Sequence, residues 1–88
     1  MTSNPRVSKR PTPEMRSAKI LGRKIKSLRT HQSLSQLDLA KKSGQGLYRQ
    51  LIVKIEAGRY LPTVFQVNAI AKALGQNPID WLKEILEI

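Results

Sequence analysis

The sequence contains no cysteine, which excludes disulfide bridges and thiolate metal sites. It has a single histidine, His31, which excludes a histidine-rich metal site. No run of about 18 apolar residues is present, so no segment is of the kind that spans a membrane. The N-terminus also lacks the apolar stretch of a signal peptide. We therefore expect a cytoplasmic protein with no cofactor and no metal.

What remains is a small and strongly basic chain. Its 88 residues are enough for one domain, and 40% of them are apolar, which is enough for a core. Nine of the 16 basic residues lie in residues 1–33 beside a single acidic residue, whereas residues 61–88 carry more acidic than basic side chains. A net charge of +10, gathered toward one end of the chain, indicates a polyanionic partner such as nucleic acid.

Residues 1–16 combine three prolines with basic residues and follow neither a helical nor a strand period. We expect a flexible basic arm there, which either contacts DNA or only raises solubility. From Ser17 onward, apolar residues recur at helical spacing, and no strand pattern appears. Residues 17–88 are therefore expected to form an all-α domain of five short helices.

Local signals place these helices. The first has an apolar face at Leu21, Ile25 and Leu28. The second begins at a capping box between Ser35 and Asp38, ends at Gly44, and is expected to turn Leu37 and Ala40 inward. The buried side of the third is predicted at Leu47, Leu51, Ile52 and Ile55. The fourth starts at the capping pair Thr63 and Gln66, and the fifth at Asn77 and Pro78 with Trp81 facing inward.

The stretch from Leu34 to Gly44, LSQLDLAKKSG, resembles the first helix of the helix-turn-helix in Cro/cI-type repressors, the lambda-repressor-like or XRE family. Residues 21–29, 55–62, 71–75 and 79–82 look like that family's opening helix, the stop after its recognition helix, and its fourth and fifth helices. The resemblance covers residues 17–83 and places the helix-turn-helix at about 35–57. It implies a lambda-repressor-like fold whose third helix reads double-stranded DNA in the major groove.

The same resemblance implies roles for individual residues. The residues matching the base-reading positions are Tyr48, Arg49, Gln50 and Lys54. Those matching contacts to phosphate or the minor groove are Gln36, Lys41, Arg59 and Tyr60, although Tyr60 can equally pack on Pro62. Arg29 and Glu56 match a structural salt bridge of related repressors. Because the family usually dimerises, the apolar end of the last helix is the candidate dimer interface, or else it only frays: Leu82, Ile85, Leu86 and Ile88.

Two departures from the family pattern concern the third helix. The span from Gly44 to Glu56 is two residues longer than usual, so either Gln45 and Gly46 extend the turn or a neighbouring helix gains half a turn. In addition, Leu51 and Val53 occupy outward positions that are usually small or polar. They either contact thymine methyl groups or pack against something other than DNA.

The sequence therefore favours a sequence-specific transcriptional regulator, a dimeric repressor that reads an inverted-repeat operator and associates with the bacterial nucleoid through its DNA. Two alternatives keep the fold: an antitoxin that binds its operator and a toxin, and a coactivator-like module that binds other proteins. No enzymatic site is expected, because the sequence shows no metal-ligand cluster, phosphate-cradling glycine loop or nucleophile–base pair.

Overall fold

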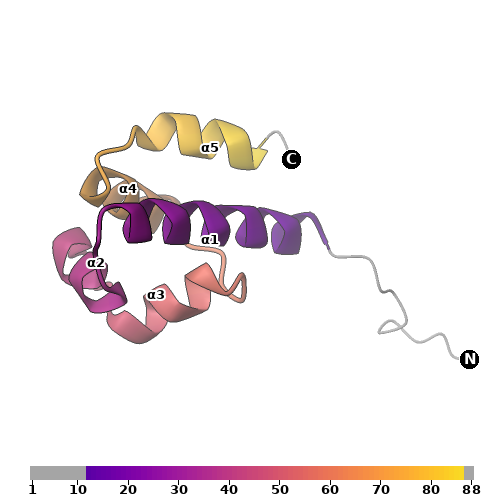
Figure 1. The fold of residues 1–88 in the computed structure, drawn as a ribbon. Coiled ribbons are helices and arrows are strands. Elements are labelled where there is room, and N and C mark those ends of the chain that lie inside the picture. Colours follow the sequence, from indigo (N-terminus) through magenta and orange to yellow (C-terminus); the bar gives the residue numbers. More distant parts are fainter. Residues whose placement is uncertain (1–11, 87–88) are drawn as a thin grey trace, which may run out of the picture.

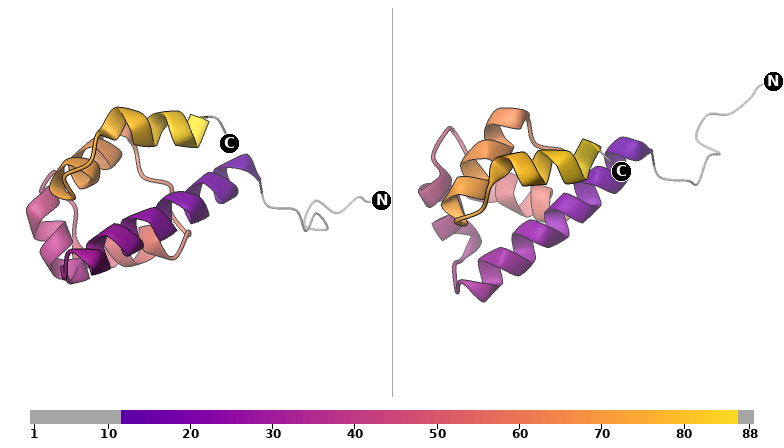
Figure 2. Two further views of the ribbon diagram at one scale, coloured as in Figure 1. Left: turned by 45° about the horizontal axis from the view of Figure 1, so that its top comes forward. Right: turned by 90° about the horizontal axis from the view of Figure 1, so that it is seen from above.

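The computed structural model describes residues 12–86, which form five helices and no strand. These are α1 (Pro13–His31), α2 (Gln36–Ser43), α3 (Arg49–Glu56), α4 (Val64–Ala73) and α5 (Pro78–Leu86). In Figure 1, α1 crosses the middle of the molecule, with α3 below it and α5 above it. The views in Figure 2 show α2 beside the C-terminal end of α1, and α2 packs against both α3 and α4. The arrangement confirms the expected all-α fold of five helices.

Helix α1 begins at Pro13, earlier than the Ser17 predicted from the apolar spacing. The Thr12 hydroxyl accepts a hydrogen bond from the Met15 N–H at 3.1 Å, and a proline at the first helical position needs no hydrogen-bond partner. Both start signals lie before the apolar repeat and are not part of it, so the repeat alone does not show where the helix begins. Residues 13–16 are therefore helical, and residues 1–11 of the expected arm lie outside the described residues.

Helices α2 and α4 begin at the two predicted capping boxes. The Asp38 N–H donates to the Ser35 hydroxyl at 2.9 Å, and the Ser35 N–H donates to the Asp38 carboxylate at 3.0 Å. The hydrogen bond from the Ser35 backbone is the main reason that the pKa of Asp38 lies below its ordinary value. Thr63 and Gln66 make the same reciprocal pair in α4. The caps fix Gln36 as the first residue of α2.

The core contains residues from the apolar faces predicted for α1, α3, α4 and α5. Ile25, Ile52 and Ile70 have no exposed surface, and Trp81 is also buried. The prediction is wrong at one position of α2, where Leu37 is 44% exposed. Leu39 faces the core instead, and Ala40 is buried as predicted.

Helix α1 crosses the C-terminal end of α3 at Gly22. A Cβ atom at this position would lie 2.3 Å from the Ile55 carbonyl oxygen and 2.9 Å from the Glu56 carbonyl oxygen. Both neighbours are backbone atoms, so a side chain at residue 22 would force the two helices apart. The absence of a side chain at Gly22 is thus what allows α1 and α3 to pack this closely.

Replacing Gly22 by Ala is expected to lower the free energy of unfolding by about 2 kcal/mol. Overpacking of about 3 kcal/mol exceeds the roughly 1 kcal/mol that alanine gains over glycine in a helix. Urea unfolding followed by circular dichroism measures the change. Ser27→Ala, at an exposed position of the same helix, is the control and should shift the free energy by less than about 0.5 kcal/mol. A Gly22→Ala protein as stable as the parent would contradict the close crossing.

Candidate nucleic-acid interface

Helix α3 has one buried and one exposed side. Its buried residues are Leu51, Ile52 and Ile55. The exposed residues of the helix lie on its opposite side because of their spacing, and they are Arg49, Gln50, Val53 and Lys54. Tyr48 stands immediately before the helix, at the N-cap, and is 53% exposed. The four side chains expected to read bases therefore lie on or next to one surface, which we call the α3 exposed face (Tyr48, Arg49, Gln50, Val53 and Lys54).

Leu51 does not belong to that face: its burial confirms the prediction from the apolar spacing of the helix and is contrary to the outward position that the family pattern assigns to it. It is only 6% exposed, because it shares the buried side of α3 with Ile52 and Ile55. Val53 is outward, as expected, with 37% of its surface exposed. A single apolar residue on an otherwise polar helix face is ordinary for a surface helix.

The two additional residues between Gly44 and Glu56 lie in the turn. Helix α2 ends at Ser43, and α3 keeps a length of 8 residues. Gly44, Gln45 and Gly46 all have positive φ, of 65°, 58° and 75°, so the chain makes a tight left-handed turn. The Leu47 N–H donates to the Gly44 carbonyl at 3.0 Å, and the Leu47 side chain is buried. Gln45 and Gly46 therefore lie in the turn between α2 and α3, in agreement with the first of the two alternatives.

The N-terminus of α2 carries backbone N–H groups that its cap does not satisfy. The Ser35 hydroxyl takes the Asp38 N–H, and the N–H groups of Gln36 and Leu37 have no carbonyl one turn before them within the helix. Such groups, together with the helix dipole, favour a bound phosphate. The Gln36 side chain is half-buried and donates through Nε2 to Glu56 Oε1 at 3.2 Å.

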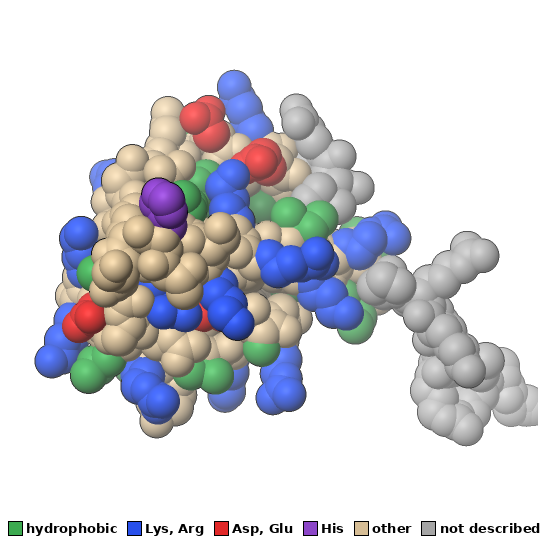
Figure 3. Space-filling view, viewed as in Figure 1, with side chains coloured by type: hydrophobic (Ala, Val, Ile, Leu, Met, Phe, Trp, Pro, Cys, Tyr) green, Lys and Arg blue, Asp and Glu red, His purple; other side chains and the backbone are tan. Residues whose placement is uncertain are grey.

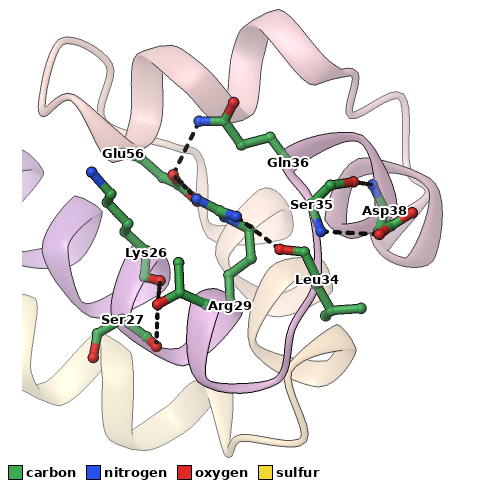
Figure 4. A network of polar contacts seen from close by, with 9 residues as sticks. Lys26, Ser27, Arg29, Leu34, Ser35, Gln36, Asp38 and Glu56 are labelled. Carbon is green, nitrogen blue, oxygen red and sulfur yellow. Dashed lines mark hydrogen bonds and ion pairs between the residues drawn. The ribbon is translucent and has the colours of Figure 1, made fainter.

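Arg29 and Glu56 form a bidentate ion pair below this corner of the molecule (Figure 4). Arg29 Nε lies 2.6 Å from Glu56 Oε2, and Nη2 lies 2.9 Å from Oε1. Arg29 Nη1 donates to the Leu34 carbonyl at 2.8 Å. The two side chains are only 10% and 3% exposed. Hydrogen bonding to Glu56 raises the pKa of the Arg29 guanidinium, so burial does not remove its positive charge.

The remaining residues expected at phosphates differ in their surroundings. Lys41 and Arg59 are exposed, whereas Tyr60 is half-buried and packs against the core. The Tyr60 ring therefore serves packing, and its contribution to a DNA contact is limited to the exposed part. Figure 3 shows Lys and Arg side chains over much of this side of the molecule, including the lower part where α3 lies, and acidic side chains both at the top and at the lower left.

Lys24 of α1 makes a contact that the sequence pattern does not reveal. Its Nζ lies 2.6 Å from the Glu84 carboxylate of α5 and 5.8 Å from the centroid of the Trp81 ring. One charge of the basic side of α1 is thus compensated within the protein. Residues 24 and 84 are remote in sequence, and no local signal shows that α1 and α5 cross there.

The expected dimer residues of α5 divide into three kinds. Leu82 and Ile85 are half-buried and pack partly against the protein's own core. Leu86 is 83% exposed, and Ile88 lies outside the described residues.

In residues 12–86, no group of three His, Cys, Asp or Glu side chains is placed to hold a metal ion. None of the helices described is both long enough and apolar enough to cross a membrane.

Comparison with known proteins agrees with this geometry. A sequence model of a helix-turn-helix family matches residues 25–82. A protein of Methanothermobacter thermautotrophicus, described as an uncharacterized HTH-type transcriptional regulator, is 38% identical over 56 residues, which cover 64% of this chain and 78% of the relative. The matched region contains α2, α3 and the turn between them. The chain belongs to the Cro/cI-type (XRE) helix-turn-helix family, whose members are DNA-binding transcription regulators.

Proposed function

We propose that the protein is a sequence-specific transcription regulator that inserts the α3 exposed face into the major groove of duplex DNA. The observation that carries this proposal is the division of α3 itself. Its apolar side completes the core, and its opposite side presents Arg49, Gln50 and Lys54 to solvent. A helix of this kind, preceded by a capped helix with free N–H groups, fits the docking geometry of a helix-turn-helix on DNA.

The chemistry of the α3 exposed face suits base edges. The guanidinium of Arg49 can donate to guanine O6 and N7, and the amide of Gln50 can pair with adenine N6 and N7. Val53 lies one turn further and supplies an apolar contact for a thymine methyl group. Lys54 reaches either a base or a phosphate, and the Tyr48 hydroxyl suits a phosphate. These contacts are expected to set the sequence preference.

A second set of residues positions the protein on the backbone without reading sequence. Gln36, with the free N–H groups at the start of α2, is proposed to bind one phosphate. Lys41 and Arg59 supply exposed positive charge, and the exposed part of Tyr60 contacts a sugar or phosphate. Each cationic contact releases counterions, so affinity should fall steeply as salt is raised.

The proposed assembly is a dimer that acts as a repressor by occupying its operator. One copy reads a half-site, and two copies would place their α3 helices about 34 Å apart, one turn of DNA. Leu86, with the outer parts of Leu82 and Ile85, offers the contact between copies, together with Ile88. The coactivator-like alternative loses one of the two residues that suggested it, because Leu51 is buried.

Arg59→Gln is expected to make the log–log dependence of affinity on salt shallower by about 0.9, since one phosphate contact is lost. Fluorescence anisotropy with a mixed-sequence duplex of about 20 base pairs, at several salt concentrations, measures that slope. Lys83→Gln removes the same charge from an exposed position of α5 and serves as the matched control. Equal effects of the two substitutions would mean that only net charge matters and would contradict the proposed orientation on DNA.

A further inference from the structure

The carboxylate of Glu56 is shared between the two helices of the helix-turn-helix and α1. It belongs to the last residue of α3, and its side chain is 3% exposed. Oε2 accepts from Arg29 Nε, while Oε1 accepts from both Arg29 Nη2 and Gln36 Nε2. Figure 4 shows Gln36 reaching from the start of α2 to this oxygen. The role proposed above for Gln36 as a phosphate ligand does not explain why its amide points inward to a carboxylate.

The contact with Glu56 determines the orientation of the Gln36 side-chain amide, that is, which of its nitrogen and oxygen faces the carboxylate. Because Nε2 faces the carboxylate, the amide carbonyl is turned away from it, and one Nε2 hydrogen is used by Glu56. Gln36 is the first residue of α2, so its side chain belongs to the N-terminal end of that helix. The uncapped backbone N–H groups of Gln36 and Leu37 belong to the same end. The contact with Glu56 therefore holds the Gln36 side chain in one position next to these two backbone donors.

Arg29 acts on the same corner in two ways. Its Nη1 donates to the carbonyl of Leu34, the residue before the N-cap, and so holds the start of α2 in place. Its charge also neutralises Glu56. Without that neutralisation, a carboxylate behind Gln36 would repel the phosphate that Gln36 is meant to bind.

We propose that Glu56 and Arg29 are positioning residues for DNA binding, because Glu56 holds the Gln36 side chain in place at the end of α2 where a backbone phosphate is proposed to bind. The inference rests on the proposed function and deepens it. A free glutamine side chain loses rotamer freedom when it binds, and a side chain that is already held loses less. The end of α3 is thus coupled to the phosphate contact of α2 by a side-chain network, in addition to any role in stability.

A double-mutant cycle on DNA affinity tests the coupling. Gln36→Met removes the amide at similar length, and Glu56→Gln leaves one amide oxygen to serve three donors. Binding is measured at low salt with a mixed-sequence duplex, since a phosphate contact is independent of sequence. We expect Gln36→Met to weaken binding about tenfold and Glu56→Gln about fivefold, but Glu56→Gln to add less than about twofold in the Gln36→Met background. The affinity of each variant is corrected for its folded fraction.

Gln32→Met is the matched control, because Gln32 also donates a side-chain amide hydrogen bond, to the Leu74 carbonyl at 2.9 Å, at the other end of the α1–α2 connection. It should leave affinity unchanged. If Glu56→Gln does not fold, Glu56→Asp keeps the charge but withdraws the carboxylate from Gln36, and the cycle uses it instead. Equal losses from the Glu56 substitution in both backgrounds would overturn the positioning role alone. No binding of the duplex by the unsubstituted protein would overturn the proposed function, and the positioning role with it.

Discussion

Replacing both Arg49 and Gln50 by alanine is expected to abolish discrimination between operator and mixed-sequence DNA while leaving the fold intact. Each well-placed bidentate contact with a base is worth about 1–3 kcal/mol, so the double substitution should weaken operator binding at least about 100-fold. Both side chains are exposed, so the free energy of unfolding should change by less than about 0.5 kcal/mol. Competition titrations of operator against mixed-sequence duplex measure the first quantity.

The control for this variant removes similar side chains from another surface. Lys72→Ala with Gln76→Ala takes one cation from the last turn of α4 and one amide from the segment after that helix, and neither residue belongs to the α3 exposed face. That protein should keep its preference for the operator. If instead the Arg49 and Gln50 variant discriminated as well as the parent, the assignment of α3 as the reading helix would be wrong.

Arg29→Met is expected to lower the free energy of unfolding by about 3–5 kcal/mol, because it leaves the Glu56 carboxylate buried without its partner. For a domain of this size, that is a large part of the roughly 5–10 kcal/mol available. The Leu34 carbonyl loses its donor as well. Adding Glu56→Leu to Arg29→Met should recover most of the stability, since an apolar pair of similar volume avoids the cost of an unpaired charge.

The second ion pair of α1 provides the comparison. Lys24 and Glu84 lie as close together as Arg29 and Glu56, at 2.6 Å, but their side chains are 32% and 54% exposed. Lys24→Met should therefore cost no more than about 1 kcal/mol. Urea unfolding followed by circular dichroism measures the free energy of unfolding of Arg29→Met, of Arg29→Met with Glu56→Leu, and of Lys24→Met. Similar losses for Arg29→Met and Lys24→Met would show that burial of the Arg29–Glu56 pair is not what determines its contribution.

The sequence predicts those features that depend on neighbours along the chain. The capping boxes at Ser35 and Thr63 involve residues three positions apart, so their hydrogen bonds can be anticipated from the residue types alone. The apolar repeats of α1 and α4 are also local, and they identify core residues such as Ile25 and Ile70 correctly. The start of α1 is local too, but its signal is the pair Thr12 and Pro13, which an apolar repeat does not include.

Features that depend on how helices cross are not predicted. The hydrogen bond from Gln36 to Glu56 and the ion pair of Lys24 with Glu84 join residues 20 and 60 positions apart. At Leu51 the two sequence arguments disagree: the apolar spacing of α3 predicts the buried side, which the structure confirms, whereas the family pattern predicts an outward position. Helix α3 has only 8 residues, and the side that turns inward is the one formed by Leu51, Ile52 and Ile55, which packs against α1 and α2.

Selection from a random pool of duplex DNA tests the central claim that the α3 exposed face reads sequence. The protein is mixed with the pool at about 150 mM salt, near physiological ionic strength, and the bound fraction is sequenced. The account predicts enrichment of an inverted repeat whose half-sites lie about one turn of DNA apart, and loss of that enrichment in the Arg49 and Gln50 double variant. Binding without enrichment of any sequence, or the same enriched repeat with the double variant, would contradict it.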